Sequence, residues 1–379
     1  MWMKIAIIGA GPIGLSIAKK LSSLGHSVTV YEEHKSIGIP QHCAGVVSRS
    51  FIERYVGSKH ILNRFNRIKL YSPSNISVTL HDNSWFVGVI DRVGFDCELY
   101  DRCYEYCCLG VRVNAVNYRK ASIEVNGIIK SYDLVINAEG ASHRILGKTL
   151  NPYVDRVPGI QMDLECRLSN VDLDTIQVFF SKLTPKFFIW LLPLGDGIVR
   201  VGLGSSRKPY TRLIYVLSKH PIISKQIGKY RVLRVFGGWI LRGPVLKTPY
   251  LGRLLYIGDS AIQVKPLTGG GLLTGLKSVD ALTKAFNECS DVNNIGVRYA
   301  KLNLDLVMKL RRQRVLVKLL NLLVNTPKTM DKAFSIISQS NLLEAIGRDL
   351  DFDNHESIPR SIILKIHLVI SSFIRALIS

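Results

Sequence analysis

The feature that most constrains this chain is a glycine-rich turn that follows an apolar run at its N-terminus. The run Lys4 to Ile8 is apolar and β-branched, as in a buried parallel strand. Gly9, Gly11 and Gly14 follow it at the spacing G-x-G-x-x-G. In such a turn the first glycine permits a tight bend, the second lets a pyrophosphate approach the backbone, and the third lets the next helix pack on the strand. The pattern predicts the start of a dinucleotide-binding fold.

A helix is expected directly after this turn. It begins at Pro12 and Ile13 and reaches about Leu24, and Gly25 ends it. Unbonded amides and the positive end of the helix dipole lie at its N-terminus, where they suit the charge of a phosphate. We therefore expect Pro12 and Ile13 to border the bound nucleotide.

The next strand places an acid where a ribose is expected. Residues 28–31 read as this strand, and Glu32 stands at its end, 23 residues after Gly9. A carboxylate there accepts hydrogen bonds from the ribose hydroxyls of a dinucleotide. Glu33 takes this place if the strand is one residue longer. The fingerprint with its acid fits FAD and NAD alike.

A second glycine-rich segment, about 250 residues later, favours FAD. Residues 254–257 read as a strand, and Gly258 and Asp259 follow at its carboxyl end, where an acid can bond a ribityl hydroxyl. A helix is then expected over residues 272–285, with amides that can face the flavin edge where negative charge builds on reduction. The residues that open this helix are Gly269, Gly270, Gly271 and Leu272. The two segments together predict an FAD site closed by a late part of the chain.

Charge and cysteine content limit the partners of this chain. Its formal net charge of +21 calls for nucleic acid, an anionic membrane surface or an anionic substrate. No nucleic-acid-binding signature is found, and the basic residues gather late among apolar ones, which favours a membrane surface. Seven cysteines and no signal peptide predict a cytoplasmic protein, peripheral at the inner membrane face. We expect no metal site, because the clustered cysteines lack paired spacing and read as packing residues of one helix: Cys97, Cys103, Cys107 and Cys108.

The fold class expected is mixed α/β (α+β): a Rossmann-like FAD-binding domain, an antiparallel β-sheet substrate domain and C-terminal helices. The FAD-binding domain is expected to be discontinuous, over residues 1–150 and 246–290. The sheet is expected over residues 151–245 and the helical region over residues 291–379. Residues 361–379 read as an amphipathic helix that either docks on the protein itself or lies on a membrane surface.

These motifs, together with two further segments, resemble the geranylgeranyl reductase family over residues 4–290. The residues Pro-Gln-His-Cys-Ala-Gly at 40–45 look like the family's cysteine-glycine segment beside the flavin. The residues Gly-Gly-Trp-Ile at 237–240, which include Trp239, look like the family's approach to the late FAD motif.

The most specific similarity is to the family pattern P-x-x-Y-x-W-x-F-P, which lies in the substrate cavity. Pro185, Trp190 and Pro193 match this pattern. Phe188 stands for the tyrosine and lacks its hydroxyl, and Leu192 stands for the phenylalanine.

The family belongs to the para-hydroxybenzoate hydroxylase-like superfamily of FAD proteins, and its enzymes saturate isoprenoid double bonds of archaeal membrane lipids and of the chlorophyll side chain. The resemblance implies FAD as the cofactor, with Ala44, Gly45, Arg92 and Gly140 beside it. Ala44 replaces a glycine of the family segment, and Glu139 replaces the usual aspartate before Gly140. For Arg92 a surface ion pair remains the alternative.

The chemistry implied is transfer of a hydride from N5 of reduced FAD to an unactivated trisubstituted alkene. Protonation precedes or accompanies it, and the faces of Trp190 and Phe188 can stabilise the positive charge by ~2 kcal/mol when dry. Cys43, His42 or a water that they hold can supply the proton. The alternatives are a pocket-lining Cys43, a structural hydrogen bond from His42, and an aromatic pair that only fills the sheet core.

Three partners are expected: a prenyl lipid, an anionic membrane surface, and an electron donor that is ferredoxin or NAD(P)H. Two other functions remain open on the same scaffold. One is an FAD-dependent monooxygenase or halogenase, which would consume oxygen. The other is a non-catalytic flavoprotein that keeps FAD for stability.

Overall fold

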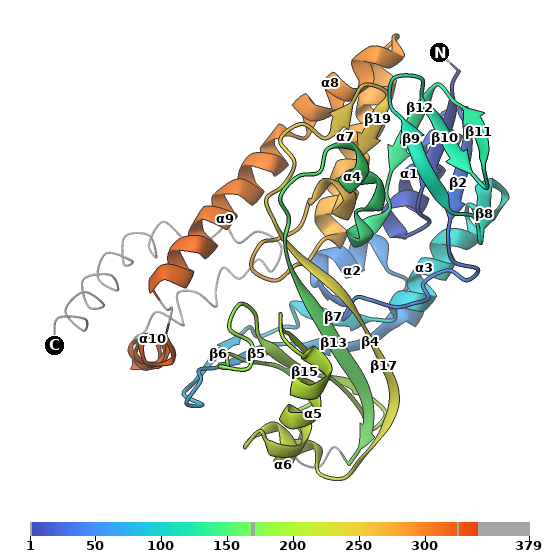
Figure 1. The fold of residues 1–379 in the computed structure, drawn as a ribbon. Helices are drawn as coiled ribbons and strands as arrows, with labels where there is room; N and C mark the ends of the chain where they lie inside the picture. The colour runs from blue at the N-terminus through green and yellow to red at the C-terminus, as the bar shows by residue number, and fades with distance from the viewer. Residues whose placement is uncertain (1, 168–170, 324–325, 340–379) are drawn as a thin grey trace. The chain divides into compact units, whose positions relative to one another are not determined.

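The computed structural model of this protein describes residues 2–167, 171–323 and 326–339 (Figure 1). The chain forms two compact units. The first comprises Met1–Gln41, Arg92–Arg156 and Trp239–Val317. The second comprises His42–Asp91, Val157–Gly238 and Lys318–Ser379.

The first unit is built on a six-stranded sheet in the order β18-β19-β12-β1-β2-β8. All neighbouring pairs are parallel except β18 with β19. In Figure 1 the early strands of this sheet, in blue, therefore lie in one sheet with the much later β12 and β19, and β1 is the neighbour of β12. The strands are β1 (Lys4–Ile8), β2 (Ser27–Glu32), β8 (Cys107–Leu109), β12 (Leu134–Asn137), β18 (Tyr250–Leu251) and β19 (Leu254–Tyr256). This arrangement confirms the expected Rossmann-like fold.

Helices and a small second sheet complete the first unit. A three-stranded antiparallel sheet contains a hairpin whose turn residues, Asn126 and Gly127, have φ angles of 51° and 77°, as expected for an Asn-Gly turn. Its strands are β9 (Val113–Asn117), β10 (Ser122–Val125) and β11 (Ile128–Ser131). The helices are α1 (Pro12–Ser23), α3 (Arg92–Asp101), α4 (Arg144–Thr149), α7 (Leu272–Glu288), α8 (Val292–Leu302) and α9 (Leu304–Leu323), which continues past this unit, with short 3₁₀ turns η2 (Tyr104–Tyr106), η3 (Gly140–Ser142) and η5 (Gly258–Ala261).

The prediction that four cysteines share one helix is wrong. Helix α3 ends at Asp101, and Cys107 and Cys108 lie in β8, where they pair with Val30 and Tyr31 of β2. Pairing with a strand distant in sequence thus overrides the local helical pattern. Burial raises the pKa of the Cys107 thiol to about 12, which keeps it protonated and unreactive. Within the described residues, no group of three or more His, Cys, Asp or Glu could hold a metal ion.

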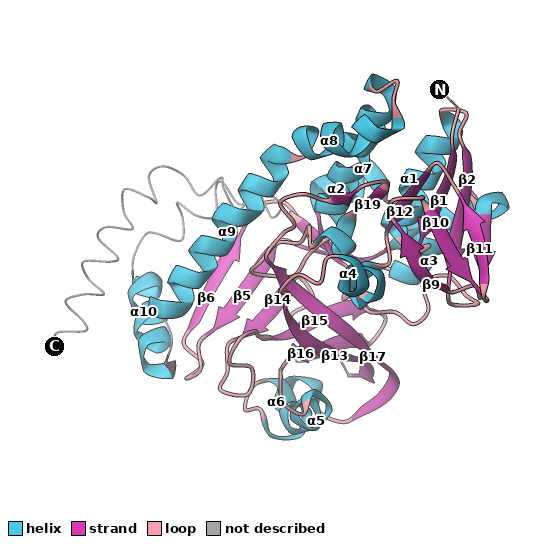
Figure 2. Cartoon of the chain, turned by 45° about the horizontal axis from the view of Figure 1, so that its top comes forward, coloured by secondary structure: helices cyan, strands magenta, loops and turns pink. Residues whose placement is uncertain are grey.

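The second unit is built on a seven-stranded sheet in the order β17-β13-β16-β15-β14-β5-β6 (Figure 2). Strands β14 and β5 pair in parallel. The strands of the sheet are β5 (Arg67–Tyr71), β6 (Ser77–His81), β13 (Asp155–Cys166), β14 (Thr175–Phe179), β15 (Ile189–Gly195), β16 (Ile198–Gly204) and β17 (Tyr230–Gly243). The remaining elements are β3 (Val46–Ser48), β4 (Ile61–Phe65), β7 (Val87–Ile90), α2 (Arg49–Tyr55), η1 (Ser58–His60), α5 (Pro209–Lys219), α6 (Ile223–Ile227) and α10 (Pro327–Gln339).

The two faces of this sheet differ, because successive residues of a strand point to opposite sides. One face is apolar and packs against α5 and α6, which Figure 2 shows together on one side of the sheet. Its core includes Met162, Leu164, Val199, Val201, Leu213, Val216 and Ile223. On the other face lie Gln161, Asp163, Trp190 and Arg200, the four residues called the site face below, all less than a tenth exposed.

The units divide the chain differently from the expected domains. Residues 42–91 belong with the antiparallel sheet rather than with the FAD-binding part, and residues 291–317 belong with the first unit. The helix expected at residues 361–379 lies outside the described residues. In the part of the chain that the structure describes, no helix is both long and apolar enough to cross a membrane.

Candidate functional site

The glycine turn of the first unit leaves no room for side chains at two of its three glycines. Gly9 has a φ of +102°, and a Cβ atom there would lie 2.5 Å from the carbonyl oxygen of Ala138. A Cβ atom on Gly14 would lie well under 3.0 Å from the Gly9 carbonyl oxygen. Gly11 differs, because a Cβ atom there would meet nothing within 4 Å. The space in front of Gly11 is therefore open, as approach of a pyrophosphate requires.

Helix α1 presents its N-terminus to this open space. It begins at Pro12, and its N-cap, Gly11, offers no side-chain hydrogen bond to the first amides. The side chain of Ile13 packs against Gly258 and Gly275. A Cβ atom on Gly258 would lie 3.2 Å from the Ile13 side chain, and a Cβ atom on Gly275 would lie 2.5 Å from the same side chain. Ile13 thus joins the early motif to the late one by packing.

The two candidate acids after β2 have different surroundings. Glu32 is the last residue of the strand, and its Oε2 accepts a hydrogen bond of 2.9 Å from the amide of Ala10 in the glycine turn. Glu33 forms ion pairs with Arg112 and Arg144. Burial raises the pKa of Glu33, but these arginines outweigh burial and hold it below its ordinary value. Glu32 is therefore the better candidate for a ribose ligand.

The late motif forms a second close-packed turn at the carboxyl end of β19. Gly258 has a φ of +65°, and Asp259 follows it in η5. The Asp259 carboxylate lies so close to Gly271 that a side chain at position 271 would collide with it. Burial raises the pKa of Asp259, and His143 and Arg92 act against this rise. Helix α7 begins at Leu272 without a side-chain cap, so its first amides remain available to an anionic edge.

The sequence assigned no role to two charged residues near this motif, Lys265 and Glu139. Lys265 is only 6% exposed and lies over the glycine run: a Cβ atom on Gly270 would lie 3.0 Å from its Cε. Glu139 does not face a ligand, because its carboxylate accepts hydrogen bonds from the amides of Ile145 and Leu146. It therefore caps α4. Gly140, beside it, has a φ of +70° and open space around it.

Arg92 is a buried residue rather than a surface one. It begins α3 and is 9% exposed. Its Nη2 donates to both carboxylate oxygens of Asp96, at 3.0 and 3.1 Å. The ion pair named as the alternative therefore exists, and it is buried.

These features fit FAD at both ends of the cofactor. The turn offers open space at Gly11 and a helix N-terminus without a side-chain cap for the pyrophosphate, and Glu32 stands at the adjacent strand end. Asp259 and the start of α7 offer a carboxylate and a second helix N-terminus. We therefore expect the glycine turn, Glu32, Asp259 and the start of α7 to bind FAD, with Ile13 acting through packing.

In the second unit the segment His42–Gly45 is held at four points. The Nδ1 of His42 donates to the carbonyl oxygen of Gly237 at 2.6 Å, and Gln161 Nε2 donates to the carbonyl oxygen of His42 at 3.2 Å. Arg200 Nη1 donates to the carbonyl oxygen of Ala44 at 2.5 Å. The Ile90 amide donates to the carbonyl oxygen of Gly45 at 2.9 Å. Sequence reasoning missed Gln161 and Arg200, because only strand register brings them here.

Within this segment Cys43 and His42 have distinct environments. The amide of Gly45 donates to the Cys43 sulfur at 3.4 Å. A Cβ atom on Gly238 would lie 2.9 Å from the His42 ring, so β17 packs directly on that ring. His42 therefore makes the structural hydrogen bond that was the alternative to catalysis, and its Nε2 is left for other chemistry.

The aromatic residues of the 185–193 segment form a cluster next to the site face. The rings of Phe188 and Trp190 meet edge to face with centroids 6.1 Å apart, and Phe187 stacks on Phe188 at 4.1 Å. Trp190 Nε1 donates to Gln161 Oε1 at 3.3 Å, and a Cβ atom on Gly202 would lie 2.5 Å from the indole ring. Trp190, Gln161 and His42 are thus linked in one chain of hydrogen bonds.

The other proposed substrate residues lie in different places. Pro185 lies in the turn before β15, and Pro193 lies within that strand, where Asn63 Nδ2 donates to its carbonyl oxygen at 3.1 Å. Trp239 belongs to the first unit and is 47% exposed, with the Arg156 guanidinium 4.3 Å from its ring centroid. No single unit therefore brings Trp239 to the Trp190 cluster.

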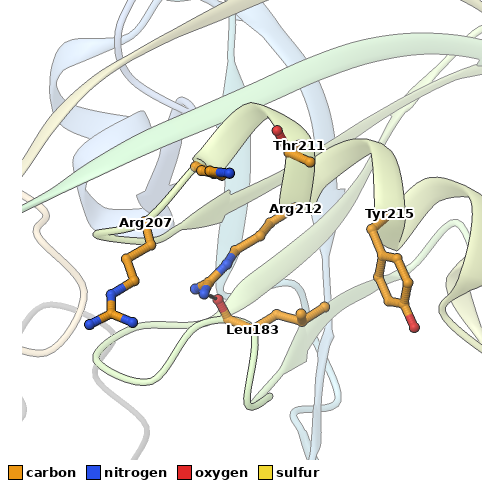
Figure 3. Close-up of a pocket in the computed structure, with 6 residues that line it drawn as sticks. Leu183, Arg207, Thr211, Arg212 and Tyr215 are labelled. Carbon is orange, nitrogen blue, oxygen red and sulfur yellow. Dashed lines mark hydrogen bonds between the residues drawn. The ribbon is translucent and has the colours of Figure 1, made fainter.

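A pocket of about 540 Å³ opens beside α5 in the second unit (Figure 3). It is lined by Leu183, Arg207, Lys208, Thr211, Arg212 and Tyr215. Arg212 Nη1 donates to the carbonyl oxygen of Leu183 at 2.5 Å and to Ser205 Oγ at 2.6 Å, so it fastens the loop that leads into residues 185–193. The pocket contains none of the site residues proposed from the sequence.

Comparison with known proteins shows what this chain is similar to. The model of an NAD(P)-binding Rossmann-like domain matches residues 7–44. An uncharacterised protein of Methanocaldococcus jannaschii is 27% identical over 93% of both chains. The digeranylgeranylglycerophospholipid reductase of Methanothrix thermoacetophila is 26% identical and covers 72% of this chain and 75% of its own. A second such reductase, from Methanopyrus kandleri, is 28% identical and covers 73% of this chain and 74% of its own.

Solved structures give the same fold. A geranylgeranyl bacteriochlorophyll reductase-like protein of Thermoplasma acidophilum aligns with a TM-score of 0.77 at 20% identity, over 95% of this chain and 98% of its own. The flavin-dependent halogenase CmlS aligns with a TM-score of 0.59 at 18% identity, over 83% of this chain and 62% of its own. The sequence relatives and the shared fold support the resemblance to the geranylgeranyl reductase family and an FAD-dependent oxidoreductase.

Proposed function

We propose that this protein saturates C=C double bonds in the geranylgeranyl chains of isoprenoid membrane lipids of the archaeal type. The observation that carries the proposal is similarity over nearly three quarters of the chain to reductases named for such lipids. The aromatic cluster of Phe187, Phe188 and Trp190 supports it, because a prenyl chain requires an apolar surface.

Reduced FAD, when bound, supplies a hydride equivalent from N5. The alkene gains this hydride on one carbon and a proton on the other, so that the double bond becomes a single bond. The two electrons come from an external donor, for which ferredoxin and NAD(P)H are the candidates.

The residues of the second unit are assigned three roles. Phe188 and Trp190 bind the prenyl chain and stabilise positive charge on its tertiary carbon through their ring faces, by about 2 kcal/mol in a dry site. Cys43 donates the proton, and its sulfur is held by the Gly45 amide. His42 fixes the segment through its bond to Gly237 and can relay the proton from Nε2.

The proposal is tested by mass spectrometry of lipid products. The FAD-loaded protein is reduced with dithionite and incubated with a digeranylgeranyl phospholipid, and we expect a gain of two mass units for each double bond reduced. Protein left oxidised serves as the control. A lipid that keeps its mass with fully reduced flavoprotein contradicts the proposal.

A monooxygenase or halogenase on this scaffold is the second candidate, because a flavin-dependent halogenase shares the fold. The two functions differ in their need for oxygen. Lipid saturation should proceed under nitrogen at an undiminished rate, whereas product formed only with stoichiometric consumption of oxygen indicates the second candidate.

We also propose peripheral contact with an anionic membrane, on the basis of the net charge of +21. Flotation with vesicles that contain phosphatidylglycerol, compared with neutral vesicles, measures this contact. Deletion of residues 358–379 should reduce flotation. Equal flotation of the shortened chain assigns the contact to another part of the protein.

A further inference from the structure

The segment His42–Gly45 lies over a pair of buried charges that the catalytic proposal does not use. Arg200 is fully buried and Asp163 is 3% exposed. The two residues face each other in the register of β13 and β16. Burying such an ion pair costs desolvation free energy. Its position under the segment His42–Gly45 therefore suggests a role in holding that segment.

Asp163 and Phe236 fix the orientation of the Arg200 guanidinium. Its Nε donates to Asp163 Oδ1 at 2.7 Å and its Nη2 donates to Asp163 Oδ2 at 3.0 Å. The Phe236 ring lies beside it, with the ring centroid 5.0 Å from Cζ. Arg234 Nε donates to Asp163 Oδ2 at 2.6 Å and so holds the carboxylate from its other side.

This arrangement leaves Nη1 of Arg200 aimed at the loop. It donates to the carbonyl oxygen of Ala44 at 2.5 Å. Ala44 lies between Cys43 and Gly45, whose amide donates to the Cys43 sulfur. The backbone angle of Ala44 therefore sets where the sulfur lies.

We propose that Arg200 is a positioning residue, which fixes Cys43 by holding the Ala44 carbonyl oxygen. Asp163 is its support, because the two-pronged bond locks the guanidinium plane. This inference rests on the proposed function only for the chemical role of Cys43. A lysine at position 200 keeps the charge but cannot bond Asp163 at two points and Ala44 at once.

Hydrogen exchange of the full-length, FAD-loaded protein tests this positioning directly. In Arg200→Lys we expect amides of residues 43–47 to exchange about tenfold faster than in the wild-type protein, because one charge-assisted hydrogen bond is lost. Peptides from β14 and β15 should keep their wild-type rates. The matched control is Arg231→Lys, since Arg231 forms an exposed ion pair with Glu165 in the same sheet.

A kinetic measurement separates positioning from plain structural support. Saturation by Arg200→Lys should show kcat reduced about tenfold with KM within about twofold of wild type. Combined with Cys43→Ala, the lysine variant should cause no further loss, because both changes act through the same thiol.

Unchanged exchange over residues 43–47 in a folded Arg200→Lys protein overturns the inference, as does an equal increase throughout the sheet. If that variant does not fold, Arg234→Lys replaces it, because Arg234 is partly exposed; about threefold faster exchange over 43–47 is expected, and no change refutes the role. A Cys43→Ala protein with wild-type turnover contradicts the proton-donor role of the proposed function, and the exchange rates alone then decide whether Arg200 holds the segment.

Discussion

Alanine at Gly11 and at Gly14 should affect this protein in opposite ways, although both residues belong to one fingerprint. At Gly14 the new methyl group would lie well under 3.0 Å from the carbonyl oxygen of Gly9. Helix α1 would have to withdraw from β1 by roughly 1 Å to relieve this overlap. Overpacking of this kind costs about 1–3 kcal/mol, so the apoprotein should melt about 1–4 °C lower than wild type.

At Gly11 the methyl group would enter the open space where the pyrophosphate is expected. The backbone there has φ −72° and ψ 175°, which alanine adopts without strain. The smaller entropy of the unfolded chain and the poorer capping by alanine oppose each other, so the melting temperature of the apoprotein should change little. The bound pyrophosphate would be pushed away from the amides of α1. Loss of one charge-assisted hydrogen bond, about 1.5–3 kcal/mol, should weaken FAD binding by roughly 10- to 100-fold.

The assay is titration of each apoprotein with FAD, followed by quenching of flavin fluorescence, together with thermal unfolding in the absence of FAD. Gly11→Ala with wild-type affinity would show that the pyrophosphate does not pass over this residue. Gly14→Ala with an unchanged melting temperature would refute the argument from close packing. A fall in apoprotein stability for Gly11→Ala as large as that for Gly14→Ala would refute the assignment of open space.

Three further outcomes are expected. Gly202→Ala should slow lipid saturation at least several-fold with FAD content unchanged, because its methyl group would lie 2.5 Å from the Trp190 ring; turnover and the absorbance ratio of flavin to protein check this. Glu139→Gln should lower stability by about 1–2 kcal/mol, measured by thermal unfolding, because the anionic cap of α4 is lost. Burial lowers the pKa of His220 from 6.5 to about 4, so the unfolded chain takes up a proton in this interval that the folded protein excludes. Stability present above pH 6.5 should therefore fall by roughly 3 kcal/mol as the pH drops toward 4, and urea midpoints at pH 7 and 4.5 should differ less in His220→Gln.

The early motif could be read from the sequence because its physics is local. Gly9, Gly11 and Gly14 act within a single strand, turn and helix, and Glu32 ends the next strand. The late motif was found for the same reason, since Asp259 and Leu272 also belong to one strand, turn and helix. The contact that joins the two motifs, Ile13 against Gly258 and Gly275, could not be read, because it depends on the order of strands in the sheet.

The second unit was harder to predict because its pairings are distant in sequence. Strand β5 pairs in parallel with β14, about a hundred residues later, and this pairing draws residues 42–91 into the second unit. Strands this short carry little pattern of their own. The cysteines of β8 were misplaced for the same reason, because only pairing with β2 makes that segment a strand.

The chemistry of the site face explains why polar residues lie on one side of a sheet whose other side is an ordinary core. A buried Arg–Asp pair contributes little net stability, and apolar residues of similar volume often serve a core equally well. The site face nevertheless keeps Asp163 and Arg200 buried, and Gln161 beside them is 2% exposed. Each donor among them bonds a backbone carbonyl of the segment that contains Cys43: Gln161 that of His42, and Arg200 that of Ala44. The buried polar groups that cost desolvation free energy therefore lie where they hold the segment His42–Gly45, which has no regular secondary structure. We therefore expect replacement of the pair by apolar residues of similar volume to cost more in turnover than in stability.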